Sequence, residues 1–234
     1  MFALVQDGSI TKYFSGNQGI TLGDIQYPKQ IFTLWTKSER EAIGIYEVIQ
    51  DNTNKKDEEY YINTNVSYSV AQYTQAEVDA DVNAKGIRIN SFSVGDNKVV
   101  GSYGSATAKA HADIKWTQAQ IDDPSLVGTA PEGADTNTVR VEGLKTIKIR
   151  TVKSQAAGIL RDTDWYIIRK ADANTAIPSA ITTHRAAVRT KCAEMETAIT
   201  NAADTPAIET LCTYTEQEDG SVTRPLGELP TLES

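Results

Sequence analysis

The chain has 234 residues, 40% of them apolar and 23% charged, with a formal net charge of −8 and a pI of about 4.9. This length supports one large domain or two to three small ones, and the composition is that of a folded soluble protein rather than a disordered chain. The negative charge argues against broad nucleic-acid binding, because a phosphate-neutralising surface needs clustered Lys and Arg.

The cysteine content and the hydrophobic runs limit where the protein works. Cys192 and Cys212 are the only cysteines, which indicates free thiols in a reducing compartment. No apolar run approaches the roughly 18 residues that a membrane span requires. Residues 1–8 turn too soon for a signal peptide, so we expect neither secretion nor a membrane partner.

The N-terminal region, residues 1–50, predicts a small α+β unit. Asp7-Gly8 separates two β-prone runs, and this dipeptide is typical of a hairpin turn because both positions adopt positive φ. Thr36 or Ser38 precedes acidic residues, as expected at the start of a helix. The expected elements are a hairpin of residues 2–6 and 9–14, an extended segment at 27–35, a helix at 36–41 that ends at Gly44, and a strand at 45–49.

Residues 60–121 predict a β-rich middle region, which follows a polar linker at 52–59. Thr74 is the expected N-cap of a short helix, and Gly86 its end. The expected elements are strands at 60–73, 87–92 and 98–103 and helices at 74–85 and 105–113. Residues 122–142 are rich in Gly, Pro, Asp and Thr, which indicates a loop and the clearest domain boundary.

A helical module is expected at residues 143–212, followed by a polar tail at 213–234 without periodicity. Apolar side chains recur on one face from Leu144 to Leu160, and Pro178 suits the first turn of another helix. Along that helix, a seam with alternating spacings of four and three residues consists of Ile181, Arg185, Val188, Cys192, Met195 and Ile199. We favour packing of this seam within its own domain over the alternative, an oligomeric helix.

Basic residues cluster around the first of these helices. Between Arg140 and Lys170 the chain carries eight Lys or Arg against three acids. We interpret this run as a solvated helix face rather than as a nucleic-acid site. Taken together, the elements predict an α+β fold with an N-terminal β-hairpin unit, a β-rich middle region and a C-terminal helical module.

No set of residues indicates catalysis or metal binding. His111 and His184 stand in unrelated contexts without a Cys or carboxylate at ligand spacing, so we expect lone surface histidines. Neither cysteine neighbours a histidine within its own element, which argues against thiol catalysis. We expect no enzyme, no cofactor and no bound metal.

A pair of carboxylates, Asp162 and Asp164, flanks Thr163 and has the residue types of an acid–base pair. A helix start follows directly, so we favour capping and ion pairing with Arg161 or Arg169.

The same stretch carries a family resemblance. Its residues are Leu160-Arg161-Asp162-Thr163-Asp164-Trp165-Tyr166-Ile167-Ile168-Arg169, then Ile177-Pro178, then His184-Arg185-Ala186-Ala187-Val188-Arg189. They resemble the C-terminal module of tailed-bacteriophage tail and tail-fibre assembly chaperones and related virion tail proteins. That pattern has a helix ending in Leu, a Thr/Ser-Asp-Trp turn, an Arg, a Pro-started helix and a Tyr-Arg-x-x-Leu-Arg step. This chain has His184 for the Tyr and Val188 for the Leu.

The N-terminal stretch adds a weaker resemblance to small phage proteins encoded near fibre genes. It consists of Phe2-Ala3-Leu4-Val5-Gln6-Asp7-Gly8, Tyr27-Pro28 and Gly44-Ile45-Tyr46. Both resemblances together cover about 80 of the 234 residues and leave out residues 60–140.

The resemblance implies a non-enzymatic tail or tail-fibre protein, made in the bacterial host cytoplasm and located in the virion tail. It implies docking on another tail, fibre or baseplate component, and it leaves a homo-oligomer open. Trp165 would pack against the first helix. Arg169, Arg185 and Arg189 would pair with Asp162, Asp164 or a partner's carboxylates. We favour internal packing over partner contact for the implied module residues, which are Asp164, Trp165, Tyr166, Arg169, Arg185 and Arg189.

Two alternative functions stay open. The first is a transient tail-fibre assembly chaperone that the virion does not retain. The second is a carbohydrate-binding receptor module that uses exposed Tyr and Trp, with Trp35 and Trp116 as the residues to test.

Overall fold

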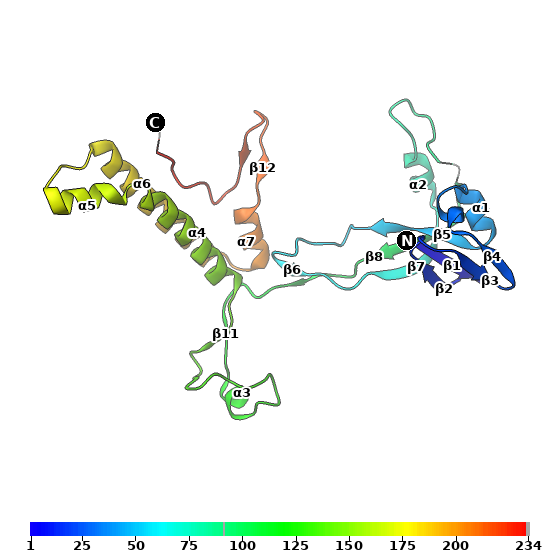
Figure 1. The fold of residues 1–234 in the computed structure, drawn as a ribbon, viewed down its shortest axis with the longest axis horizontal. Coiled ribbons are helices and arrows are strands. Elements are labelled where there is room, and N and C mark those ends of the chain that lie inside the picture. The colour runs from blue at the N-terminus through cyan, green and yellow to red at the C-terminus, as the bar shows by residue number, and fades with distance from the viewer. Residues whose placement is uncertain (91, 233–234) are drawn as a thin grey trace. The chain divides into compact units, whose positions relative to one another are not determined.

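The computed structural model describes residues 1–90 and 92–232 and confirms an α+β fold, with strands in the N-terminal and middle regions and helices toward the C-terminus (Figure 1). The chain divides into two compact units. The first consists of Met1–Lys56 and Asn63–Thr107, and the second of Asp57–Ile62 and Ala108–Ser234. The loop expected as a domain boundary, residues 122–142, lies inside the second unit.

A five-stranded sheet organises the first unit. Its strands are β1 (Phe2–Gln6), β2 (Ser9–Phe14), β5 (Ile45–Asp51), β7 (Ser67–Gln72) and β8 (Asn97–Ser102), in the order β2-β1-β5-β8-β7. β5 and β8 are parallel, and the other neighbours are antiparallel. The predicted hairpin is confirmed, with positive φ angles of 50° at Asp7 and 72° at Gly8.

The core of the first unit packs on one face of this sheet. The smaller elements are β3 (Ile20–Leu22), β4 (Ile25–Tyr27), η1 (Lys29–Phe32) and α1 (Lys37–Ala42). The expected extended segment at 27–35 is wrong beyond β4, because the 3₁₀ turn η1 brings Ile31 and Phe32 into a cluster with Leu4 and Ile45. Burial of these two side chains outweighs the extended preference of the segment.

The short helices of the first unit begin as predicted. Thr36 and Glu39 form a capping box at α1, and Thr74 forms the same arrangement with Glu77 at α2 (Gln75–Ala80). α2 ends at Ala80 instead of residue 85. Its continuation is interrupted because side chains bind nearby backbone groups instead, as when Asp81 Oδ2 accepts from the Asn90 N–H at 2.8 Å.

The strand expected at 87–92 is wrong for the described part of that range, and residue 91 lies outside the described residues. Only an isolated bridge joins Val82 and Arg88. The expected strand at 60–73 is split into β6 (Tyr61–Ile62) and β7, and β6 pairs with β9 (Thr107–Ala108). The strand expected at 98–103 is confirmed as β8.

The helix expected at 105–113 is wrong, because the backbone of this segment serves other elements. The carbonyl of Lys109 accepts from Thr205 Oγ1 at 2.6 Å. The carbonyls of Ala110 and His111 accept from the N–H groups of Leu144 and Lys145, both at 3.0 Å. The extended segment thereby satisfies N–H groups in the first turn of the helix that begins at Leu144. These N–H groups have no partner within that helix.

Helices dominate the second unit. They are α3 (Gln118–Asp122), α4 (Leu144–Arg161), α5 (Asp164–Ala173), α6 (Ser179–Asn201) and α7 (Thr205–Cys212). Short strand pairs are β10 (Ile114–Lys115) with β11 (Val139–Val141), and β12 (Thr215–Glu216) with β13 (Val222–Thr223). In Figure 1, α4 and α6 lie side by side, α5 lies beyond one end of this pair, and α7 lies near the other end.

The helical module expected at 143–212 thus contains α7, which the sequence interpretation did not separate. Its start is marked by Asp204, whose side chain accepts from the Ala207 N–H at 2.8 Å, and by a proline in the first turn. The predicted seam on α6 is buried and packs within the second unit, where Val188, Met195 and Ile199 meet α4. This packing agrees with the favoured interpretation, in which the seam packs within its own domain.

The C-terminal tail, expected to be only polar, contributes a core residue. Leu226 is 4% exposed and joins the cluster between α4 and α6, and its N–H donates to the carbonyl of Leu211 at 2.9 Å. Arg224 Nε donates to the carbonyl of Gly227 at 3.1 Å and closes the turn that presents Leu226. A single buried apolar side chain in a polar sequence creates no hydrophobic periodicity, so the sequence pattern did not indicate that Leu226 is a core residue.

Two glycines give a matched test of packing in the second unit. A Cβ on Gly143 would lie 2.3 Å from the backbone carbon of Ala112, so we expect Gly143→Ala to destabilise the unit by about 1–3 kcal/mol. Gly158 lies within α4 with nothing inside 4 Å of such a Cβ, so Gly158→Ala is expected to stabilise by about 1 kcal/mol. Urea unfolding measures both, and shifts of the same sign would contradict the packing.

Candidate functional site

Two of the predicted module residues, Asp164 of α5 and Arg185 of α6, meet where α4, α5 and α6 join, and Arg185 connects the three helices. Its Nη1 donates to the carbonyl of Leu160 at 2.7 Å and to Thr163 Oγ1 at 2.6 Å. Its Nη2 donates to Asp164 Oδ1 at 2.9 Å. Because Arg185 is only 7% exposed, these bonds fix the end of α4 to the start of α5 in a largely dry environment.

Asp164 therefore pairs with Arg185 of another helix, as the resemblance implied. The pairing with Arg161 or Arg169, which the local sequence favoured, is wrong for Asp164. Arg161 and Arg169 are nearer to Asp164 in sequence, but the packing of α6 brings Arg185 into contact with it. Thr163 precedes α5 without capping it, because its hydroxyl donates to the Leu160 carbonyl at 3.0 Å.

The ring contacts of the aromatic pair on α5, Trp165 and Tyr166, come from the same helix. The guanidinium carbon of Arg169 lies 4.7 Å from the Trp165 ring centre and 5.3 Å from that of Tyr166. The two rings are 3.8 Å apart. The implied packing of Trp165 against the first helix stays a prediction. Its side chain is 49% exposed, and the ring contacts given above come from α5.

α5 leaves its apolar side chains uncovered. None of its residues is buried, and Ile167 and Ile168 are 43% and 67% exposed. Arg189, one turn after Arg185 on α6, is exposed, and its Nη1 reaches the Arg185 carbonyl only at 3.5 Å. The module thus combines a fixed junction with an uncovered helix that presents aromatic, aliphatic and cationic groups, a composition typical of protein interfaces.

On α4, the side chains of Arg150 and Lys153 are exposed, as expected of a solvated face, whereas that of Lys148 is only 14% exposed. Lys148 binds Glu59 at 2.5 Å and the hydroxyl of Tyr60 at 3.0 Å. Burial raises the pKa of Tyr60 to about 12, against the opposing effect of the Lys148 hydrogen bond. Two further cations are paired, Arg150 with Glu142 and Lys153 with Glu196.

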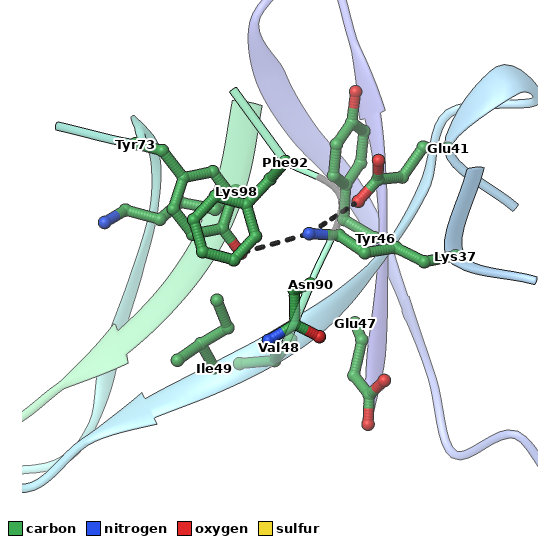
Figure 2. A pocket seen from close by; sticks show the side chains of 10 residues that line it. All are labelled: Lys37, Glu41, Tyr46, Glu47, Val48, Ile49, Tyr73, Asn90, Phe92 and Lys98. Atoms are coloured by element: carbon green, nitrogen blue, oxygen red, sulfur yellow. Dashed lines mark hydrogen bonds and ion pairs between the residues drawn. The ribbon is translucent and has the colours of Figure 1, made fainter. Parts of the chain in front are cut away.

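The first unit contains a pocket of about 280 Å³, which no local sequence pattern indicated (Figure 2). Tyr73 and Phe92 stack with ring centres 3.8 Å apart at 10°. Figure 2 shows Lys37 between Tyr73 and Glu41, where its Nζ donates to the Tyr73 hydroxyl at 3.2 Å and lies 3.7 Å from Glu41. The lining comprises Lys37, Glu41, Tyr46, Glu47, Val48, Ile49, Tyr73, Asn90, Phe92 and Lys98.

The charges of this pocket compensate one another. Burial raises the pKa of Glu41, against the effect of Lys37. Lys98 pairs with Glu77 on α2, and this bond, together with the Thr74 N–H, lowers the pKa of Glu77 to about 2. The pocket is suited to binding through mixed polar and apolar contacts, and its lining residues come from segments too far apart in sequence to be linked by spacing.

The Glu77 interaction predicts a pH effect. A lowered pKa favours the folded state above the ordinary value of 4.5, and that contribution is lost as the pH falls from 4.5 toward about 2. We expect Glu77→Gln to lower the melting temperature at neutral pH and to reduce the further loss on acidification. Melting curves across this pH range measure the effect, with Asp79→Asn on the same helix as the control. Parallel curves for wild type and Glu77→Gln would contradict it.

The histidine, cysteine and tryptophan side chains singled out in the sequence differ in burial. His184 is buried at the module, which corrects the expectation of a surface histidine. Cys192 is buried, and this burial raises the pKa of its thiol. Trp116 is buried and its ring is not available to a sugar, whereas Trp35 is half-buried with its ring centre 5.8 Å from that of Tyr27.

Two absences hold for the described part of the chain. Within residues 1–90 and 92–232, no group of three or more His, Cys, Asp or Glu is placed to hold a metal ion. Over the same ranges, none of the helices combines the length and apolarity needed to cross a bilayer. In comparisons with known proteins, no family model, no curated protein and no solved structure matches the chain.

Proposed function

We propose that the chain is a non-enzymatic structural and assembly protein of a bacteriophage tail or tail fibre, which docks through α5 on another tail, fibre or baseplate component. The observation that carries this proposal is the uncovered helix α5, with Trp165 and Ile168 exposed, fixed at its start by the buried bonds of Arg185. A pre-ordered helix loses less conformational entropy on binding than a flexible segment. The resemblance of Leu160–Arg189 supplies the kind of partner.

The test is mass spectrometry of purified particles with the copy number of this chain. Presence at a small integer multiple of the tail symmetry is expected for a retained component. Absence from particles, with recovery alongside free fibre protein from host cells, would instead identify the transient chaperone. Absence from both would contradict the proposal.

Carbohydrate recognition is the second candidate function, and we propose the pocket in Figure 2 as its site in place of Trp35 and Trp116. The pocket in Figure 2 combines aliphatic side chains with an amide at Asn90 and a carboxylate at Glu47, groups that can orient a hydroxylated ligand. A glycan array probed with wild type and Asn90→Ala tests it. Absence of binding by wild type, or equal binding by the variant, would exclude this pocket.

A further inference from the structure

We infer that the partner of α5 is an acidic protein segment, which places carboxylates against the cations of α5 and an apolar side chain against Trp165 and Ile168. This inference rests on the proposed function and specifies the chemistry of the partner. We use the term α5 surface for Trp165, Ile167, Ile168, Arg169 and Lys170.

The local charge is opposite to that of the chain. Residues 161–189 carry five Lys or Arg and three Asp, a net +2, whereas the whole chain carries −8. Arg185 uses Asp164. Arg161, Arg169, Lys170 and Arg189 have no carboxylate within 4.0 Å in the part of the chain that the structure describes. The basic side chains of α4 named above differ, because acids of the same unit already bind them.

Two guanidinium groups at this junction also have an unsatisfied hydrogen-bond donor. The Nε atoms of Arg169 and Arg185 are buried without a hydrogen-bond acceptor among the described residues. Arg185 is itself more than nine-tenths buried. Buried donors without acceptors cost free energy, and a carboxylate oxygen is the acceptor that a guanidinium binds best, often through two parallel bonds.

The position of Arg169 prepares it for such a contact. Its guanidinium lies against two aromatic rings, which limits its motion and removes part of its hydration. Stacked arginines favour planar anions, so a carboxylate fits better than a neutral group. Trp, Tyr and Arg are also the residue types that contribute most to binding at protein interfaces.

The aliphatic part of the α5 surface indicates that the partner is a protein. Ile168 is 67% exposed beside Trp165, and an anion alone would leave both uncovered. The phosphates of a nucleic acid would meet the same arginines but offer no apolar contact for Ile168, which is 67% exposed. An acidic peptide segment with one apolar anchor satisfies the charges and the apolar area together.

Zero-length coupling with a carbodiimide tests the inference directly, because it joins a lysine amine only to a carboxylate in contact. The sample is the full chain in purified particles, or in its complex with free fibre protein. We expect a cross-linked peptide that joins Lys170 to an Asp or Glu of another tail or fibre protein. Lys170→Arg keeps the charge and removes the amine, so this cross-link should disappear while assembly persists.

Charge reversal supplies a second measurement. We expect Arg169→Glu to reduce the recovered copies per particle at least ten-fold, with increasing loss at higher salt. Lys12→Glu is the matched control, since Lys12 also lies over an aromatic ring, at 5.4 Å from Phe14, but belongs to the first unit. Melting curves followed by circular dichroism check that both variants are folded. If Arg169→Glu has a lowered melting temperature, the charge reversal is repeated as Lys170→Glu, because Lys170 is exposed.

The outcomes separate the two proposals. A chain that is present in particles, yet gives no Lys170 cross-link and tolerates Arg169→Glu, would overturn the acidic partner and leave the tail function standing. Association that nuclease treatment abolishes would also overturn it. Absence from particles and from free fibre protein would overturn both.

Discussion

Replacement of Arg185 by Ala is expected to destabilise the second unit by about 3 kcal/mol, a large share of the stability of a typical domain. The variant loses three hydrogen bonds at once, to Leu160, Thr163 and Asp164. Asp164 is 52% exposed and water can solvate it, so most of the cost comes from the buried acceptors and from the space left by the side chain. Urea unfolding followed by circular dichroism measures the change.

Two further variants show whether the geometry or the charge of Arg185 matters. Arg189→Ala removes an exposed cation one turn away and should change the free energy of unfolding by no more than about 0.5 kcal/mol. Arg185→Lys keeps the charge, but an ammonium cannot reproduce the planar fork, so an intermediate loss is expected. Equal stability of Arg185→Ala and Arg189→Ala would disprove the role of the junction.

Leu226→Ala is expected to cost about 3 kcal/mol, although the residue lies in a polar tail. Its side chain fills the cluster with Val152, Met195 and Ile199, and Ala would leave a cavity there. The tail should also detach more readily, because Leu226 is its buried anchor between α4 and α6. Urea unfolding measures the stability, and limited proteolysis measures how fast the tail is cut.

The control for this prediction is Leu232→Ala, which alters a side chain that is 45% exposed in the same tail. That variant should leave both unfolding and proteolysis close to wild type. Fast cleavage of the tail in the wild-type protein, with no change in Leu226→Ala, would show that the anchor does not hold in solution.

Features that depend on a few adjacent residues were predictable from the sequence. The Asp7-Gly8 hairpin and the starts of α1 and α2 follow from local backbone and capping chemistry, and all three are confirmed. The errors arise where distant groups compete for the backbone. The carbonyls of Lys109 and its neighbours accept hydrogen bonds from α7 and α4, and no property of residues 105–113 reveals this use.

The candidate site was predictable in part. Asp164 and Arg185 of the module do meet, because a heptad-like spacing places Arg185 on the buried side of α6. Local spacing favoured Arg161 or Arg169 as the partner of Asp164, whereas the resemblance included Arg185, the partner in the structure. The stacked pair Tyr73 and Phe92 was missed entirely, because their contact depends on the irregular path of the chain after α2.

The order of the two units along the chain has a consequence for modular exchange between genes. Residues 57–62 belong to the second unit although they precede much of the first, and Tyr60 packs with Leu144 and Ile208. A gene fragment that starts at Ala108 would therefore encode the helices without one of their core aromatics. Recombination can transfer the helical unit intact only together with residues 57–107, so inheritance of the whole chain is favoured over shuffling of its halves.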